Sequence, residues 1–273
     1  MSQSPRRHFL SASAFLGGVL LPQGLSPLFS NSESVFEEAQ AADASGPIPI
    51  AAAQERMDKV YRAKTTIGRI EMTIVKPGRT RTMRMKIWTS GQEKSLIVLE
   101  SPARDTGTAT LKVDKNLWNY LPKISRTVRI PPSMMLGSWM GSDFTNDDLV
   151  KDASYANDFN ASWAGPSTSP AGWIMRMTAK EGKVGLWKKI EMSVNEDATL
   201  PTQARYYDRR DRLARTMFFE DVKTLGGRKV PSVMRIVPSD KQDEYTQMKY
   251  IDMQFDAEVP ASTFSLSRLK RGR

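Results

Sequence analysis

The stretch Arg81-Thr82-Met83-Arg84-Met85-Lys86-Ile87 decides the fold, because polar and apolar residues alternate in it from Thr82 to Ile87. Successive side chains of a β-strand point to opposite faces, so both methionines and Ile87 share one face and three polar residues share the other. The preceding Lys76-Pro77-Gly78-Arg79 places Pro and Gly at the centre of a type II turn. We therefore expect residues 66–88 to form a β-hairpin.

Further stretches with strand composition follow along the chain, separated by turn residues such as Gly226-Gly227. They cover residues 94–100, 106–113, 116–121, 125–130, 173–178, 186–194, 202–208, 213–222, 229–237 and 245–255. With the hairpin they make about a dozen antiparallel strands, which is typical of one mainly β domain.

Two helical regions accompany the strands. Residues 51–62 contain helix-forming residues with an apolar face, after a Pro-containing linker at 42–50. Residues 131–159 interrupt the strand pattern with a Pro pair and a stretch rich in Met and Trp. Within this interruption, Thr145 and Asp148 have the spacing of a capping box that begins a short helix.

The N-terminus has the form of an export signal. Arg6 and Arg7 precede a Phe-Leu pair and a moderately apolar run, which resembles the twin-arginine export pattern. We expect residues 1–41 to be a signal that sends the protein to the periplasm and residues 51–273 to form one domain. Plain secretion and an uncleaved anchor are the alternatives.

Composition excludes most enzyme chemistry. The chain has no Cys, and its single His, His8, lies in the expected signal. Disulfides, Cys/His zinc sites, Cys nucleophiles and histidine bases are thereby excluded from the exported chain. Without Cys there is also no site for lipid attachment, so we expect a soluble protein. Because the usual catalytic and metal-binding side chains are missing, we expect no metal, no cofactor and no enzymatic activity.

The charge balance is basic. Removal of residues 1–41 leaves 38 Lys and Arg against 27 Asp and Glu, a net charge of +11. The basic residues cluster in three places: Arg79, Arg81, Arg84 and Lys86; Arg205, Arg209, Arg210, Arg212 and Arg215; and Arg268, Lys270, Arg271 and Arg273. Export excludes nucleic acid as a partner, which leaves an anionic membrane surface, an acidic protein face or simple solvation of these charges.

Three carboxylates deserve an enzymatic test because close carboxylates serve glycosidases and bind Ca²⁺. Asp143, Asp147 and Asp148 lie near the expected helix start, but their spacing does not match a calcium loop. Helix capping and the helix dipole already explain Asp residues at such a position. A carboxylate-dependent hydrolase is therefore the weakest of the functional alternatives.

The segment from Trp118 to Leu149 carries a resemblance to a known family. Trp118-Asn119-Tyr120-Leu121-Pro122, then Arg126 and Arg129, then residues 137–149 (GSWMGSDFTNDDL) resemble the signature of LolA-like outer-membrane lipoprotein-sorting proteins. The similarity is to the branch associated with RND/MMPL-type exporters and extends over roughly residues 50–270.

This resemblance implies an unclosed antiparallel β half-barrel, covered by short helices, around an apolar cavity for acyl chains. It implies a non-enzymatic carrier that takes lipid or lipoprotein cargo from an inner-membrane transporter, with the RND/MMPL type as first candidate, to an outer-membrane acceptor. We expect the protein to be a monomer. A sensor of envelope stress with the same fold, which binds a membrane-bound regulator, is the alternative.

Met and aromatic side chains are the candidates for the cavity, because thioethers adapt to irregular apolar shapes. The residues are Met83, Met85, Ile87, Trp118, Tyr120, Met134, Met135, Trp139, Met140, Phe144, Trp173, Met175 and Met177. Ordinary core packing is the alternative for each of them. Arg126 and Arg129 are the candidates for contact with a head group or partner, and their spacing puts them on opposite faces of a strand.

Overall fold

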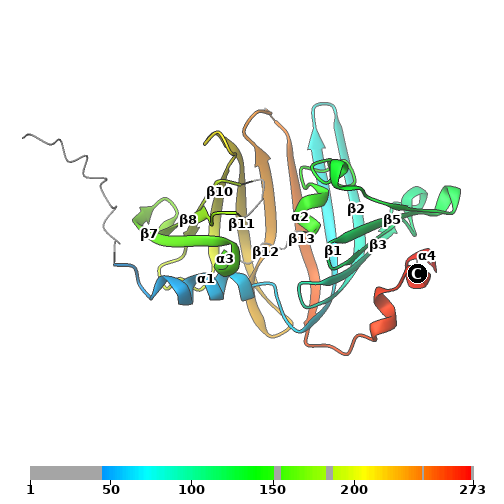
Figure 1. Ribbon diagram of the computed structural model, residues 1–273, viewed down its shortest axis with the longest axis horizontal. Coiled ribbons are helices and arrows are strands. Elements are labelled where there is room, and N and C mark those ends of the chain that lie inside the picture. The colour runs from blue at the N-terminus through cyan, green and yellow to red at the C-terminus, as the bar shows by residue number, and fades with distance from the viewer. Residues whose placement is uncertain (1–44, 151–154, 183–186, 242, 272–273) are drawn as a thin grey trace, which may run out of the picture. The chain divides into compact units, whose positions relative to one another are not determined.

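The computed structural model describes residues 45–150, 155–182, 187–241 and 243–271. Thirteen strands form one sheet in the order β6-β5-β4-β3-β2-β1-β13-β12-β11-β10-β9-β8-β7 (Figure 1). Every neighbouring pair is antiparallel. The strands are β1 (Thr65–Lys76), β2 (Arg79–Ser90), β3 (Lys94–Ser101), β4 (Ala109–Val113), β5 (Asn116–Leu121), β6 (Arg126–Arg129), β7 (Phe159–Thr168), β8 (Ala171–Ala179), β9 (Lys189–Val194), β10 (Pro201–Tyr207), β11 (Leu213–Leu225), β12 (Arg228–Pro238) and β13 (Tyr245–Phe255).

The expected hairpin is confirmed as β1 and β2. Lys76 pairs with Arg79 across the turn, where Gly78 has φ +68°, a backbone conformation that suits Gly at the third position of a type II turn. Met83 is fully buried, whereas Arg84 beside it is exposed. The alternation in the sequence therefore does separate a buried face from a solvated one.

The sheet is an unclosed half-barrel, as the family resemblance implied. Pairing of β1 with β13 joins the two halves at the centre, and β6 and β7 are the two edges. The segment between β6 and β7 carries the chain from one edge to the other. Its Trp139 and Phe144 are buried in the core on one face of the sheet.

One strand was missing from the prediction. Residues 159–168 were expected to belong to the interruption and the segment after it, but they form β7. Gly165 and Pro166 weaken its strand pattern, and the register with β8 shifts between Trp163 and Gly165. Because β7 is an edge strand, it tolerates Pro, whose missing N–H would break a ladder in a central strand.

Short helices lie over both faces of the sheet. α1 (Ile50–Lys59), α2 (Asn146–Val150) and α3 (Tyr155–Asp158) cover what we call the inner face, and α4 (Leu266–Arg271) packs on the outer face near β4 (Figure 1). α1 confirms the helix expected at 51–62, and α2 begins directly after Thr145. Among the described residues, no helix combines the length and apolar character needed to cross a membrane.

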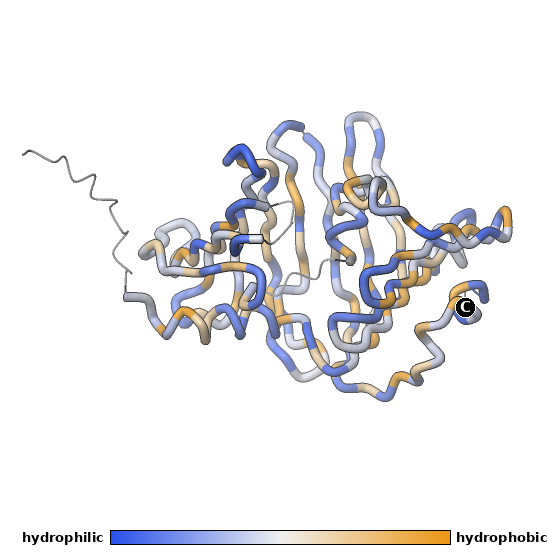
Figure 2. Tube along the Cα trace, in the orientation of Figure 1, coloured by the Kyte–Doolittle hydropathy of each residue, from blue (hydrophilic) through white to orange (hydrophobic). Residues whose placement is uncertain are grey.

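Strand β3 shows how the two faces are filled. Ile97 and Leu99 belong to the large inner core, whereas Leu96 and Val98 pack in a smaller outer cluster with Leu269 of α4. All four are buried, so this central strand reads as a continuous apolar run. Figure 2 shows the same distribution, with apolar residues along the strands and hydrophilic ones at most hairpin ends.

The expected export signal, with Arg6 and Arg7, lies outside the described residues.

Candidate functional site

A cavity of about 630 Å³ lies between the inner face of the sheet and the helices that cover it. Its apolar wall includes Met57, Val60, Ile70, Met85, Ile87, Ile97, Trp139, Phe144, Leu149, Phe159, Ile190, Met192, Met217, Phe219, Met234 and Met248. Six of these side chains are methionines, which can adapt to a flexible ligand. The volume falls within the range of about 300–1,000 Å³ that is usual for small-molecule sites.

Nine of the residues proposed for an acyl-chain cavity lie on its wall or in the core beside it. Met85, Ile87, Trp139 and Phe144 are on the wall. Met83, Met175 and Met177 are fully buried in the inner core, and Met140 and Trp173 pack half-buried against it. A role of these side chains in ligand binding stays a prediction.

Four of the proposed residues lie elsewhere. Strand β5 turns Trp118 and Tyr120 to the outer face, where they pack against the cluster around α4. Met134 ends a 3-10 helix, Pro132–Met134, and its side chain is 55% exposed; Met135 beside it is half-buried. The Pro pair at 131–132 ends the strand pattern here, so these methionines leave the plane of the sheet.

Arg215 is the main correction to the sequence analysis. It was assigned to a basic surface cluster, but it is only 7% exposed and lies on the cavity wall. Its position on β11 puts it on the same face as Met217 and Phe219, which also line the cavity. The period of two along this strand is the signal that could have revealed it.

Asp148 neutralises Arg215 through a bidentate ion pair. Arg215 Nη2 donates to Asp148 Oδ1 at 2.7 Å and Nη1 donates to Oδ2 at 2.8 Å. The guanidinium carbon also lies 4.5 Å from the ring centroid of Trp187 and 4.7 Å from that of Tyr206. Because Arg215 belongs to β11 and Asp148 to α2, the pair joins a covering helix to the sheet inside a largely apolar site.

Asp148 also completes the capping box. Its Oδ2 accepts from Thr145 N at 2.8 Å and from Thr145 Oγ1 at 2.9 Å, and its own N donates to Thr145 Oγ1 at 3.1 Å. The capping role expected for this carboxylate is thus confirmed. The Asp148 side chain therefore caps the start of α2 and, through Arg215, also fixes that helix to the sheet.

Charge interactions keep the pair ionised. Burial alone would raise the pKa of Asp148, but the Arg215 charge and the hydrogen bonds from Arg215 and Thr145 lower it overall. Burial would lower the pKa of Arg215, and Asp148 raises it above its usual range. Burial raises the pKa of Tyr155 and of Tyr206, so both phenols stay protonated at neutral pH.

We expect the stability of the folded domain to be nearly constant between about pH 5 and 8 and to fall below about pH 4. The lowered pKa of Asp148 contributes stability above its unfolded-state value of about 3.9, and this contribution is lost as the pH falls toward the folded-state value. The only His, His8, lies in the expected signal. Thermal unfolding measured across pH checks this, and a steep change between pH 6 and 8 would contradict it.

The neighbouring Asp residues also make structural hydrogen bonds. Asp143 Oδ2 accepts from Thr246 Oγ1 at 2.7 Å, which connects the segment before α2 to β13. Asp147 is buried at the cavity wall, where its N donates to Met135 O at 2.8 Å. Among residues 45–150, 155–182, 187–241 and 243–271, no three His, Cys, Asp or Glu side chains are grouped so that they could hold a metal ion.

Hydrogen bonds also hold α1 and α3 together over the cavity. Asp58 Oδ1 accepts from Tyr155 N at 2.9 Å, and Gln54 Nε2 donates to Tyr155 O at 2.9 Å. Just after α1, Tyr61 donates its hydroxyl to Pro231 O at 2.9 Å and stacks on Tyr250 at 5.1 Å between ring centroids. The cover is therefore joined to the sheet at several polar points around an apolar interior.

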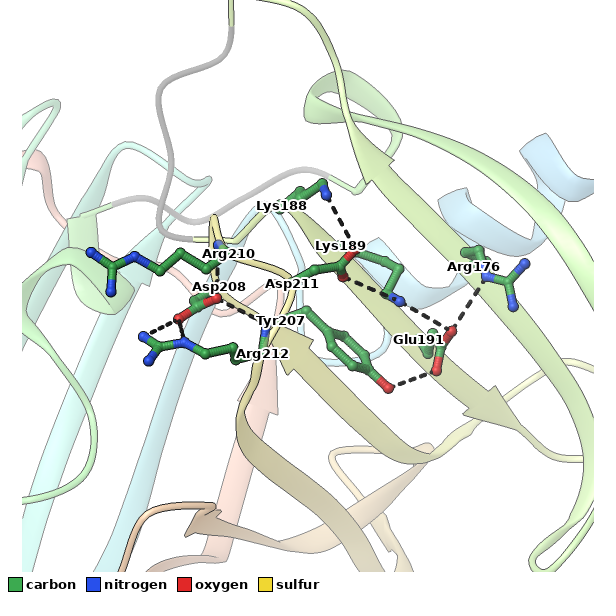
Figure 3. Close-up of polar contacts among 9 residues, drawn as sticks. All are labelled: Arg176, Lys188, Lys189, Glu191, Tyr207, Asp208, Arg210, Asp211 and Arg212. Atoms are coloured by element: carbon green, nitrogen blue, oxygen red, sulfur yellow. Dashed lines mark hydrogen bonds and ion pairs between the residues drawn. The ribbon is translucent and has the colours of Figure 1, made fainter. Parts of the chain in front are cut away.

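The basic cluster around the β10–β11 turn is partly neutralised by its own acids (Figure 3). Arg212 pairs with Asp208, with N···O distances of 3.0 and 2.7 Å, and Lys188 pairs with Asp211 at 3.1 Å. Glu191 accepts from the Tyr207 hydroxyl at 2.9 Å. The charges of Arg212 and Lys188 are thus balanced within this part of the chain.

Comparison with known proteins shows which of them share this architecture. A family model described as "Uncharacterized protein" matches residues 91–271. No curated protein matched the chain. Among solved structures, a DUF1329 family protein from Desulfovibrio piger is 25% identical with a TM-score of 0.73, and the match covers 82% of this chain and 100% of that one.

Two further solved structures share the fold. A LolA superfamily protein from Nitrosomonas europaea is 19% identical with a TM-score of 0.67, covering 81% of this chain and 99% of its own. A domain from Vibrio parahaemolyticus, assigned to outer-membrane lipoprotein sorting, is 20% identical with a TM-score of 0.68, covering 81% of this chain and 98% of its own. At these identities the likeness concerns the fold: an open sheet with helices over its inner face.

Proposed function

The chain belongs to a LolA-like family, and we propose that it is a periplasmic carrier that binds the acyl chains of a lipid or lipoprotein. In this proposal the carrier takes its cargo from an inner-membrane transporter and delivers it to an outer-membrane acceptor. The protein supplies binding and release, with no catalytic step and no cofactor.

The observation that carries the proposal is the apolar cavity beneath the helices. A cavity of about 630 Å³ lined by methionines and aromatic rings suits a flexible hydrocarbon better than a rigid polar ligand. Each CH₂ group moved from water into such a site contributes about 0.8 kcal/mol. A long acyl chain would therefore be held strongly by burial alone.

Release of the cargo requires that some contact in the protein offset the free energy gained by burying its acyl chain. The covering helices are tied down by the Arg215–Asp148 pair and by the bonds of Asp58 and Gln54 to α3. A cargo that displaces the cover would lose part of its binding free energy to these contacts. Transfer to an acceptor that binds the chain without this cost is then downhill.

We expect lipid or lipopeptide to co-purify with the protein when it is isolated from the periplasm under mild conditions. Native mass spectrometry would show a mass added to the chain, and organic extraction would identify it. An unrelated periplasmic protein taken through the same steps is the control. A chain with no added mass and no extractable lipid, from cells with normal envelope lipids, would contradict the proposal.

A further inference from the structure

Exposed large hydrophobic residues are concentrated at one end of the sheet. Five of them lie within residues 121–136, which we call the β5–β6 tip: Leu121, Ile124, Val128, Met134 and Leu136, each 39–62% exposed. The tip comprises the end of β5, a 3-10 turn at Pro122–Ile124, the edge strand β6 and the 3-10 helix after it. Large apolar side chains that are exposed together in one segment mark an interaction site more often than single exposed ones do.

The tip is also basic. Between Asp114 and Asp143 the chain has no Asp or Glu at all, and the tip itself contributes Lys123, Arg126 and Arg129, all exposed. The β10–β11 turn, in contrast, carries Asp208 and Asp211, which pair with Arg212 and Lys188 (Figure 3). Positive charge at the tip is thus combined with apolar surface, whereas at the β10–β11 turn part of it is balanced by carboxylates.

The strand register mixes the two kinds of side chain on one surface. Leu121 on β5 pairs directly with Arg126 on β6, so both point to the same face, and Val128 points there too because it lies two residues further on. Ile124 lies in the turn that connects the two strands. Figure 2 shows apolar colour at the outer end of this hairpin, on the right of the view.

We propose that the β5–β6 tip docks on an anionic phospholipid membrane surface. Apolar side chains with interleaved Lys and Arg suit the interface of a bilayer, where the former enter the acyl boundary and the latter meet lipid phosphates. An acidic protein partner would match the charge but would leave several large apolar side chains exposed to carboxylates. This docking is independent of what occupies the cavity.

The test is sedimentation of the protein with vesicles, using protein purified from the cell envelope in the processed form that it has there. Vesicles of phosphatidylcholine with phosphatidylglycerol are compared with phosphatidylcholine alone. The variant Lys123→Gln/Arg126→Gln should bind the anionic vesicles about twentyfold more weakly at low salt, since each Lys or Arg near such a surface contributes about fivefold. Ile124→Ser/Leu136→Ser should bind about tenfold more weakly at any salt concentration.

The matched control is Arg209→Gln/Arg210→Gln, which removes the same charge at the β10–β11 turn and should change vesicle binding by no more than about threefold. Equal losses in the control and tip variants would overturn the proposal, because they would indicate a diffuse effect of net charge. So would equal binding to both kinds of vesicle, or none to either. Binding of a soluble acyl probe should be unchanged in Ile124→Ser/Leu136→Ser, so a failure of the docking proposal would leave the carrier proposal standing.

Discussion

Replacement of Asp148 with Ala is expected to lower the free energy of unfolding by about 3–5 kcal/mol. The substitution leaves the Arg215 guanidinium more than nine-tenths buried and without its counter-charge, and it also removes the cap of α2. An uncompensated buried charge accounts for most of the cost, and a lost cap adds about 1 kcal/mol. Urea unfolding followed by tryptophan fluorescence would measure the change.

Two further variants separate the causes. Glu55→Ala removes an ion pair with Lys59 whose side chains are 64% and 68% exposed, and it should leave the free energy of unfolding nearly unchanged. The double variant Asp148→Leu/Arg215→Met removes both charges and should recover much of the stability lost in Asp148→Ala. If Asp148→Ala were no more harmful than Glu55→Ala, the ion pair would not hold α2 to the sheet.

The strands could be predicted because most of them carry their own evidence. In β2 each residue shows its face by its polarity, and the turn at Pro77-Gly78 fixes where the hairpin reverses. β7 lacks that evidence, because an edge strand with Gly165 and Pro166 can be stable only through its pairing with β8. Such pairing depends on residues distant in the sequence, so the local pattern does not reveal it.

The cavity was predictable in kind but only partly in detail. Met83 and Met85 alternate on the same face of β2, yet Met85 lines the cavity and Met83 is packed in the core. Periodicity identifies a face, whereas the cavity wall depends on which helix lies above each point of that face. The Arg215–Asp148 pair joins residues 67 positions apart, and no local pattern relates them.

Substitution of Ile87 by Glu is expected to weaken the binding of an uncharged fluorescent acyl ester by at least about a hundredfold. Ile87 lies on the cavity wall and pairs across the sheet with Ile97, which is also on the wall. A carboxylate there must either be buried without a partner or bring water into the site. Both outcomes reduce the free energy of acyl-chain binding by several kcal/mol. Titration of the ester, followed by fluorescence, gives the affinity.

Ile251→Glu is the matched control, since it makes the same substitution on β13 at a side chain that is 44% exposed and does not line the cavity. Its affinity for the ester should stay within about threefold of the unchanged chain. Both variants must first show the unfolding transition of a folded domain. Equal loss of binding in both would mean that the ester binds by general surface hydrophobicity. If Ile87→Glu bound the ester as well as the unchanged chain does, the acyl chain would lie outside the cavity. An unpaired carboxylate on the wall and a buried hydrocarbon exclude each other.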